Sequence, residues 1–166
     1  MIDVREERPG DVAAIRDLNR QAFGQDQEAN IVDALRANDG VLLSLVATID
    51  GRVIGHILYS PVQLGALTGA GLGPMAVHPD HQRQGVGRRL IEAGTRRLEN
   101  SDCAFIVVVG HADYYPRFGF TSARPLGITC EWDVPDDVFL VLVLDSIRMN
   151  GVSGPAKYRS EFAIVL

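Results

Sequence analysis

An abrupt change of hydrophobic period in the middle of the chain constrains its fold more than any other feature of the sequence. The apolar run Gly71–Val77 stops at His78-Pro79, and a polar loop leads into Gly85–Asn100, where apolar residues recur with helical spacing. Ala104–Val109 then follows without a polar residue, as expected of a central strand that is covered on both faces. A strand, a helix and a buried strand in this order predict a sheet with helices packed against it.

The flanking segments add further strands and helices. Before residue 71 we expect an edge strand at Met1–Glu7, a helix opened by Pro9-Gly10-Asp11 and ended by Phe23-Gly24, a second helix at about Glu28–Arg36, and strands at Leu42–Ile49 and Arg52–Ser60 joined by the hairpin dipeptide Asp50-Gly51. After residue 109 we expect a short helix around Asp113–Phe118 and a buried strand at Val138–Leu144. Residues 145–166 give no clear pattern.

The order β-α-α-β-β-β-α-β-α-β predicts the α/β (mixed α+β) class, with a central mixed sheet and helices on both of its faces. The 166 residues contain no repeat and no linker rich in Pro, Gly or Ser, and this length suits a single domain, residues 1–166. Apolar residues make up 46% and charged residues 22%, which are the proportions of an ordinary globular domain.

Charge and composition argue against several classes of partner. With 16 Lys and Arg against 21 Asp and Glu, the net charge of −5 argues against nucleic acid and permits an amine substrate. No apolar run approaches the roughly 18 residues of a membrane span, and the N-terminus lacks the pattern of a signal peptide. Cys103 and Cys130 are too few for a disulfide scaffold, and two reduced thiols are typical of a cytoplasmic protein.

The loop before the helix predicted at Gly85–Asn100 has the character of an anion site. Helix starts favour acidic side chains because their N–H groups are electropositive, yet no acid occurs here before Glu92. The basic residues at this start are Arg83, Arg88 and Arg89. Gly85 and Gly87 allow a phosphate to approach the backbone amides without Cβ atoms in the way. The alternative is a solvated basic helix start that follows a flexible loop.

Two other classes of ligand fit this segment poorly. A nicotinamide dinucleotide site needs a third glycine where Leu90 stands, and an acidic residue where Val109-Gly110 ends the next strand. His78, Asp80 and His81 lie close together in sequence, but no third and fourth ligand of the usual kind stands nearby, so we expect no metal site.

Two motifs resemble those of a known superfamily. Gln82-x-x-Gly85-x-Gly87, preceded by Val77-His78-Pro79, is similar to the acetyl-CoA signature of the GNAT N-acetyltransferases. The block from Tyr114 to Phe120 resembles the superfamily's Tyr-x-x-x-Gly-Phe motif. The resemblance implies a three-layer αβα fold with a splayed mixed sheet. It also implies transfer of an acetyl group from acetyl-CoA to an amine acceptor, by direct attack in a ternary complex and without a metal.

The resemblance further implies a role for individual residues. On the signature strand, backbone groups of Met75, Ala76 and Val77 would bind the pantetheine arm and face the thioester oxygen. Tyr115, four residues before Gly119, would be the general acid for the CoA sulfur, with Tyr114 as the less favoured neighbour. The pyrophosphate would lie on the amides of Arg83, Gln84, Gly85, Val86, Gly87 and Arg88.

The sequence departs from the family pattern at the general base. Many members carry a Glu on the signature strand, whereas Leu72–Met75 has no acid, and the Asn found upstream of the Tyr motif is absent from Val107–His111. The candidates for the base are His56, His111, Asp113 and Glu28, and a water wire to bulk solvent would also serve. Trp132 is a candidate for the wall of an acceptor pocket.

Four matters stay open at the level of sequence. Nothing in the chain fixes the length of the acyl group, so a transferase that uses another acyl-CoA remains an alternative. A non-catalytic acyl-CoA-binding or regulatory module is the alternative from a different class. The acceptor and the choice between monomer and homodimer are likewise not encoded in any motif.

Overall fold

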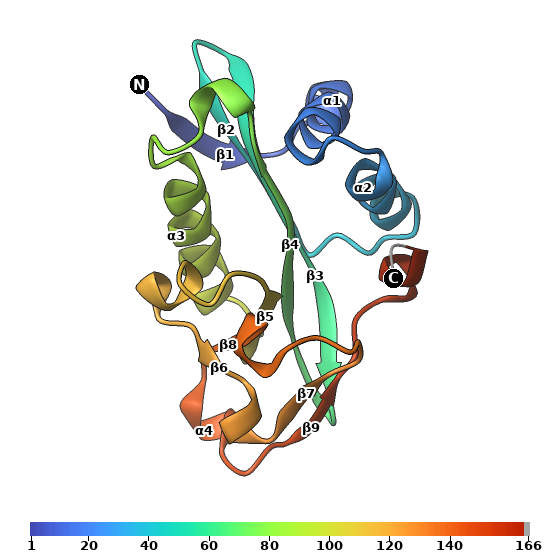
Figure 1. Cartoon of the computed structure of the whole chain (residues 1–166), viewed down its shortest axis with the longest axis vertical. Helices are drawn as coiled ribbons and strands as arrows, with labels where there is room; N and C mark the ends of the chain where they lie inside the picture. The colour runs from blue at the N-terminus through green and yellow to red at the C-terminus, as the bar shows by residue number, and fades with distance from the viewer. Residues whose placement is uncertain (165–166) are drawn as a thin grey trace.

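A mixed sheet of seven strands lies between two helical layers in the computed structural model, which describes residues 1–164 (Figure 1). The strand order is β1-β2-β3-β4-β5-β8-β6, and within the described residues β7 and β9 form a separate parallel pair. The strands are β1 (Asp3–Glu6), β2 (Leu43–Ile49), β3 (Arg52–Leu64), β4 (Leu67–Val77), β5 (Phe105–Val109), β6 (Thr121–Ser122), β7 (Ile128–Cys130), β8 (Phe139–Val143) and β9 (Gly154–Ala156).

The helices cover opposite faces of this sheet. On one side lies α3 (Val86–Glu99), and on the other lie α1 (Val12–Phe23) and α2 (Gln27–Ala37), while the short α4 (Ser146–Met149) follows β8 (Figure 1). The alternation of β2 explains the two layers: Leu45 packs in the core cluster that contains Leu90 of α3, and Val46 packs in the cluster that contains Ile15 of α1. The expectation of a mixed sheet with helices on both faces is therefore confirmed.

Several boundaries differ from those read in the sequence. The β3–β4 hairpin is longer than expected, because Val62 and Leu64 are fully buried and extend β3 beyond Ser60, while β4 begins at Leu67 rather than Gly71. The expected helix around Asp113–Phe118 is a 3₁₀-helix at Tyr115–Phe118. The C-terminal part, whose sequence gives no clear pattern, contains α4, β9 and a 3₁₀-helix at Ser160–Ile164.

The sheet opens between β4 and β5, and this opening positions the candidate site. Their parallel pairing comprises Ala70↔Ile106 and Gly71↔Val107, after which β4 continues to Val77. At its other edge β4 pairs with β3, but the register shifts where Gly73-Pro74 stands opposite a single β3 residue. A bulge of this kind bends the strand that carries it, and Pro74 has no N–H group to donate to a neighbouring strand.

Among residues 1–164, none of the helices has both the length and the apolar character that a bilayer crossing requires.

Candidate functional site

A cleft with a volume of about 1400 Å³ occupies the opening between β4 and β5. Its walls are the last part of β4, the loop before α3 with the first turn of that helix, the end of β5, and the 3₁₀-helix Tyr115–Phe118. This volume exceeds the roughly 300–1,000 Å³ of sites for drug-sized molecules. The cleft therefore suits an extended ligand or two ligands side by side.

The unpaired edge of β4 offers backbone groups to this cleft. The His78 N–H donates to the Ile54 carbonyl at 2.8 Å, so these residues form a hydrogen-bonded pair of the antiparallel β3–β4 ladder. Hydrogen-bonded and non-hydrogen-bonded pairs alternate along such a ladder, which directs the backbone of Ala76 toward β3 and that of Met75 and Val77 away from it. Met75 and Val77 line the cleft, whereas Ala76 is buried.

The loop between β4 and α3 presents its N–H groups in a concave turn. Arg83 and Gly85 both adopt left-handed conformations, with φ of 62° and 83°. Successive amides in such turns form anion-binding nests. The first bond of the helical ladder runs from the Arg89 N–H to the Gly85 carbonyl at 3.1 Å. The N–H groups of Val86, Gly87 and Arg88 therefore have no partner within the helix and are available to an anion.

The basic start of α3 and its link to β4 agree with the sequence analysis. No acidic residue lies in the first turn of α3. The Arg88 side chain pairs with Glu92 one turn later at 2.6 Å, and both side chains are exposed. The Gln82 amide donates to the Val77 carbonyl at 3.2 Å, which holds the loop against the end of β4.

Gly87 faces the second motif. A Cβ atom at Gly87 would lie 2.9 Å from the Tyr114 hydroxyl and 3.5 Å from the methyl group of Met75. The Tyr114 ring, which is half-buried, packs edge-on against Phe118 with ring centroids 5.3 Å apart, and the Arg117 guanidinium lies 5.7 Å from its centre. The structure thus brings Tyr114 to the helix start that the sequence assigns to phosphate.

Tyr115 lies deeper, in the buried cluster that also contains Leu72 of β4 and Val108 of β5. Its ring packs edge-on against Tyr114 and Phe120, with centroids 5.2 and 5.6 Å apart, and the residue is 7% exposed. Burial, with a smaller contribution from the neighbouring Tyr114, raises the pKa of Tyr115 to about 12. The hydroxyl is therefore protonated at neutral pH and able to donate.

The structure places most of the predicted binding residues on the cleft wall. Those that line it are Met75, Val77, Arg83, Gly85, Val86, Gly87, Arg88 and the predicted acid Tyr115. Ala76 and Gln84 are not part of this lining, and their predicted contacts remain predictions. Of the four candidates for the base, Glu28, His111 and Asp113 line the cleft.

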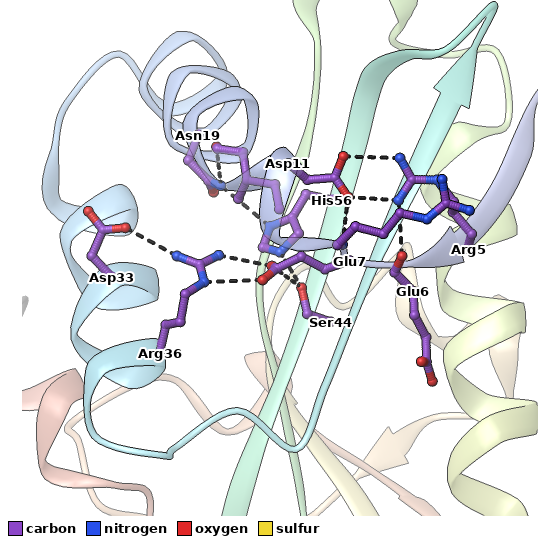
Figure 2. Close-up of polar contacts among 11 residues, drawn as sticks. Arg5, Glu6, Glu7, Asp11, Asn19, Asp33, Arg36, Ser44 and His56 are labelled. Carbon is purple, nitrogen blue, oxygen red and sulfur yellow. Dashed lines mark hydrogen bonds and ion pairs between the residues drawn. The ribbon is translucent and has the colours of Figure 1, made fainter.

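His56, the fourth candidate, lies in a sealed polar network (Figure 2). It is fully buried, its Nε2 lies 2.9 Å from the Ser44 hydroxyl, and its Nδ1 lies 3.4 Å from the Asn19 amide. The Ser44 hydroxyl donates to Glu7, which Arg36 also binds at 2.9 Å. Burial lowers the pKa of His56 to about 4, against the opposing charge of Glu7. His56 is thus neutral and does not line the cleft.

Three aromatic residues form a wall that the sequence analysis only partly anticipated. Trp132, Tyr158 and Phe162 all line the cleft. The centroids of Trp132 and Tyr158 are 4.7 Å apart, and those of Tyr158 and Phe162 are 5.4 Å apart. Tyr158 and Phe162 were missed because their segment has no periodic pattern. The only indication that these residues line the cleft was the presence of aromatic residues in an otherwise polar C-terminal stretch.

Potential metal ligands do not converge in the part of the chain that the structure describes. Residues 1–164 contain no group of three or more His, Cys, Asp or Glu side chains that could hold a metal ion. The rings of His78 and His81 lie 5.8 Å apart, and His78 Nδ1 accepts a hydrogen bond from the Asp80 N–H.

Comparison with known proteins identifies the family that the two sequence motifs resemble, and the similarity extends over nearly the whole chain. The model of the acetyltransferase (GNAT) family matches residues 12–120. The uncharacterized N-acetyltransferase YhbS of Escherichia coli K12 is 36% identical over 162 residues, which cover 96% of this chain and 97% of YhbS. The uncharacterized N-acetyltransferase YjhQ of the same organism is 35% identical over 134 residues, or 76% of this chain and 74% of YjhQ.

Solved structures show the same relationship. The crystal structure of Escherichia coli YhbS in complex with CoA has a TM-score of 0.94 and 35% identity, covering 98% of this chain and 92% of that one. A GNAT acetyltransferase from Brucella melitensis in complex with acetyl-CoA has a TM-score of 0.81 at 35% identity, with 98% of both chains covered. The resemblance of the two sequence motifs and the expectation of a splayed αβα fold are thereby confirmed. The chain belongs to the GNAT family of acetyltransferases.

Proposed function

We propose that this chain transfers an acetyl group from acetyl-CoA to an amine, with both substrates bound at the time of reaction. The observation that carries the proposal is that one cleft joins the amide-rich start of α3, the unpaired edge of β4 and Tyr115. These three features follow one another in the order of the groups in an acyl-CoA. The phosphate site matches the pyrophosphate, the strand edge matches the pantetheine arm, and the buried acid matches the thioester sulfur. The CoA and acetyl-CoA complexes of the two similar structures support the same donor.

The donor would be bound mainly by backbone groups. We place its pyrophosphate on the amides of Arg83, Gln84, Gly85, Val86, Gly87 and Arg88, where the dipole of α3 adds favourable charge. The pantetheine arm would follow β4, with hydrogen bonds to Met75 and Val77. Of the strand residues assigned from the sequence, Ala76 contributes least to this model, because its backbone faces β3.

The reaction needs a stabiliser for the oxyanion and a donor for the sulfur. The neutral amine forms a bond to the thioester carbon, and negative charge develops on the carbonyl oxygen. An N–H group of Met75 or Val77 is suited to donate to that oxygen. The carbon–sulfur bond then breaks, the sulfur leaves with the electron pair, and the Tyr115 hydroxyl donates to it.

The amine also has to lose a proton. Glu28, His111 and Asp113 line the cleft and are the candidates to accept it directly or through water. His56 is a weaker candidate, because it is sealed beneath α1 and its Nε2 and Nδ1 already face Ser44 and Asn19. A water wire to bulk solvent is the alternative to any single side chain.

Two other functions would use the same cleft. One is transfer from a different acyl-CoA, and the other is a non-catalytic acyl-CoA-binding or regulatory module. The buried, protonated Tyr115 beside the donor site favours an enzyme, because binding alone does not require an acid there. We further propose a cytoplasmic location, in keeping with the free thiols Cys103 and Cys130, and a monomer or homodimer.

The test follows the release of free CoA from acetyl-CoA, with and without a panel of primary amines, beside propionyl-CoA as a second donor. We expect release that depends on the amine and is fastest with the acetyl donor. A protein that binds CoA tightly but releases none with any amine would be a binding module. Faster release from propionyl-CoA would correct the donor but keep the reaction class.

A further inference from the structure

The cleft has two chemically different ends, separated by β4. Ala70 and Leu72 pack in the core cluster on the α3 side of the sheet. Gly71 points the other way, since a Cβ atom there would lie 2.7 Å from the ring of Tyr158. Phe162 packs against the cluster formed by α1 and α2. The aromatic wall of Trp132, Tyr158 and Phe162 therefore lies on the face opposite the amide-rich start of α3.

The three rings of the wall pack against one another and do not form an open cage. The largest separation among its three ring centroids is 6.4 Å, between Trp132 and Phe162, so no ion fits between the rings. The Glu131 carboxylate accepts a hydrogen bond from the Tyr158 N–H at 2.6 Å and ties the segment of Trp132 to the C-terminal segment. The pairing of β7 with β9 reinforces this connection. A bound molecule would meet an apolar surface made of three rings that are tilted against one another.

The charged residues of the two ends differ as well, although Glu92, which pairs with Arg88, also lines the cleft at the end near α3. The arginines that line the cleft are Arg83, Arg88 and Arg117. Arg83 lies in the loop before α3, Arg88 lies in the first turn of this helix, and Arg117 lies over Tyr114 beside Gly87. At the other end stand Phe23, which is 38% exposed, and Glu28, whose two carboxylate oxygens accept from the Gln25 amide at 3.1 Å. Arg159, next to Tyr158, is paired with Glu161 at 3.0 Å.

We infer that the acceptor is a cationic amine with an aromatic or apolar body, held between the aromatic wall and Glu28, and lacking a carboxylate beside its amino group. This inference rests on the proposed function and names its acceptor class. The wall would bind the body of the acceptor, and aromatic faces also attract an approaching ammonium group. Glu28 would attract the cation and repel a carboxylate, so amino acids would be rejected.

The experiment compares phenethylamine with phenylalanine, which adds a carboxylate, and with putrescine, which carries a second ammonium group where phenethylamine has its apolar ring. Rates of CoA release are measured at saturating acetyl-CoA. We expect kcat/KM for phenethylamine to exceed those of both others by about 10- to 200-fold, the range that an apolar pocket provides. Equal or better use of phenylalanine or putrescine would overturn the inference.

Variants test the two halves of the acceptor site. Phe23→Ala and Trp132→Ala should raise KM for phenethylamine and leave KM for acetyl-CoA unchanged, and Phe23 is exposed enough to be replaced without unfolding. Glu28→Gln should narrow the preference for phenethylamine over phenylalanine. The matched controls are Leu126→Ala and Glu99→Gln, both at exposed positions outside the cleft. Unchanged acceptor KM in the Phe23 and Trp132 variants would overturn the inference.

If the proposed transferase function itself is wrong, the assays give a different result from the one that rejects only the acceptor class. In that case no amine promotes CoA release, whatever its body or charge, although CoA still binds. An enzyme that turns over other amines but prefers phenylalanine or putrescine retains the proposed function and loses only the acceptor class assigned to it.

Discussion

Tyr114 and Tyr115 are neighbours in sequence but reach different parts of the cleft. The Tyr114 hydroxyl lies at Gly87, whereas Tyr115 is buried between β4 and β5. With a pKa of about 12, Tyr115 lies well above a free thiol near 8.5, so complete proton transfer to a solvated thiolate costs about 5 kcal/mol. The cost is smaller in a dry site, where burial raises the thiol pKa as well. Tyr115 is best suited to donate a hydrogen bond as charge develops on the sulfur.

The first prediction concerns these two hydroxyls. Tyr115→Phe should lower kcat by at least tenfold, because a placed acid contributes roughly 10²–10⁴-fold to the rate, and it should leave CoA affinity nearly unchanged. Tyr114→Phe should lower kcat less and act mainly on the affinity for CoA, because its hydroxyl faces the phosphate end. Steady-state kinetics and a CoA titration of both variants check this. The reverse pattern would move the acid by one residue, to Tyr114.

The second prediction concerns His56, which is surrounded by Glu7, Asn19, Arg36 and Ser44 (Figure 2). Because its pKa is about 4 in the folded protein and about 6.5 when unfolded, the unfolded chain binds more protons between these values. The free energy of unfolding should fall as the pH drops below 6.5, with a total loss of about 3 kcal/mol by pH 4.

Denaturant unfolding between pH 5 and 7.5 checks this. The carboxyl groups of Glu7 and Asp11 have lowered pKa values, so they lose their stabilising charge only below that window. His56→Gln keeps hydrogen-bonding capacity toward Ser44 and Asn19 and should flatten the dependence. An equally steep slope in His56→Gln would show that another group causes it.

At the scale of elements, the loop before α3 combines a conformational and a steric requirement. Gly85 has a φ of 83°, a backbone conformation that residues other than glycine rarely adopt. A Cβ atom at Gly85 would have no neighbour within 4 Å, so the requirement for glycine there is conformational. Gly87 is helical, and its requirement is the space between the first turn of α3 and the Tyr114 hydroxyl. The two glycines should therefore respond differently to substitution.

The third prediction is that Gly87→Val weakens CoA binding by tenfold or more, which corresponds to about 1.4 kcal/mol. The branched side chain would occupy the path of the phosphate and press on Tyr114. Gly10→Ala is the matched control, because Gly10 has no neighbour within 4 Å of an added Cβ atom. Isothermal titration of CoA into both variants checks this, and similar affinities would mean that the phosphate lies elsewhere.

Gly71 of β4 shows where sequence reasoning is insufficient. From the Gly-x-Gly pattern alone, Gly71 resembles a neutral position, and Gly71→Val would be expected to leave CoA binding largely intact. In the structure a Cβ atom at Gly71 would lie 2.7 Å from the Tyr158 ring and 2.9 Å from Val62. Such a substitution disturbs the core and the aromatic wall, so it is unsuitable as a control.

Other elements differ in whether residues close in sequence or far apart in sequence determine them. The hairpin at Asp50-Gly51 and the amphipathic α3 are encoded by nearby residues, and both were predictable. β9 pairs with β7 across more than twenty residues, and the contact of Tyr158 with Trp132 depends on that pairing. No local pattern encodes this pairing, which is why Tyr158 and Phe162 were missed by the sequence analysis.

At the scale of the whole molecule, ligand binding should stabilise the fold. The cleft is built from β4, β5, α3 and the 3₁₀-helix Tyr115–Phe118, so it exists only in the folded chain. The fourth prediction is that CoA or acetyl-CoA at 100 times its dissociation constant adds about 2.7 kcal/mol to the free energy of unfolding. For a domain of this size, that corresponds to a rise in Tm of about 5–10 °C.

Thermal unfolding with CoA, acetyl-CoA, NAD and ATP at equal concentrations checks this. NAD and ATP carry phosphates but lack a pantetheine arm, so they should raise Tm far less. Equal stabilisation by NAD would show that the site recognises phosphate groups without the arm that follows β4.

The central claim is direct transfer from acetyl-CoA to an amine within one cleft. The most direct measurement is a matrix of initial rates of CoA release, in which the concentrations of acetyl-CoA and of an accepted amine are both varied. Direct attack in a ternary complex predicts double-reciprocal lines that intersect. Parallel lines, the pattern of an acetylated enzyme intermediate, or CoA release that is independent of the amine would contradict it.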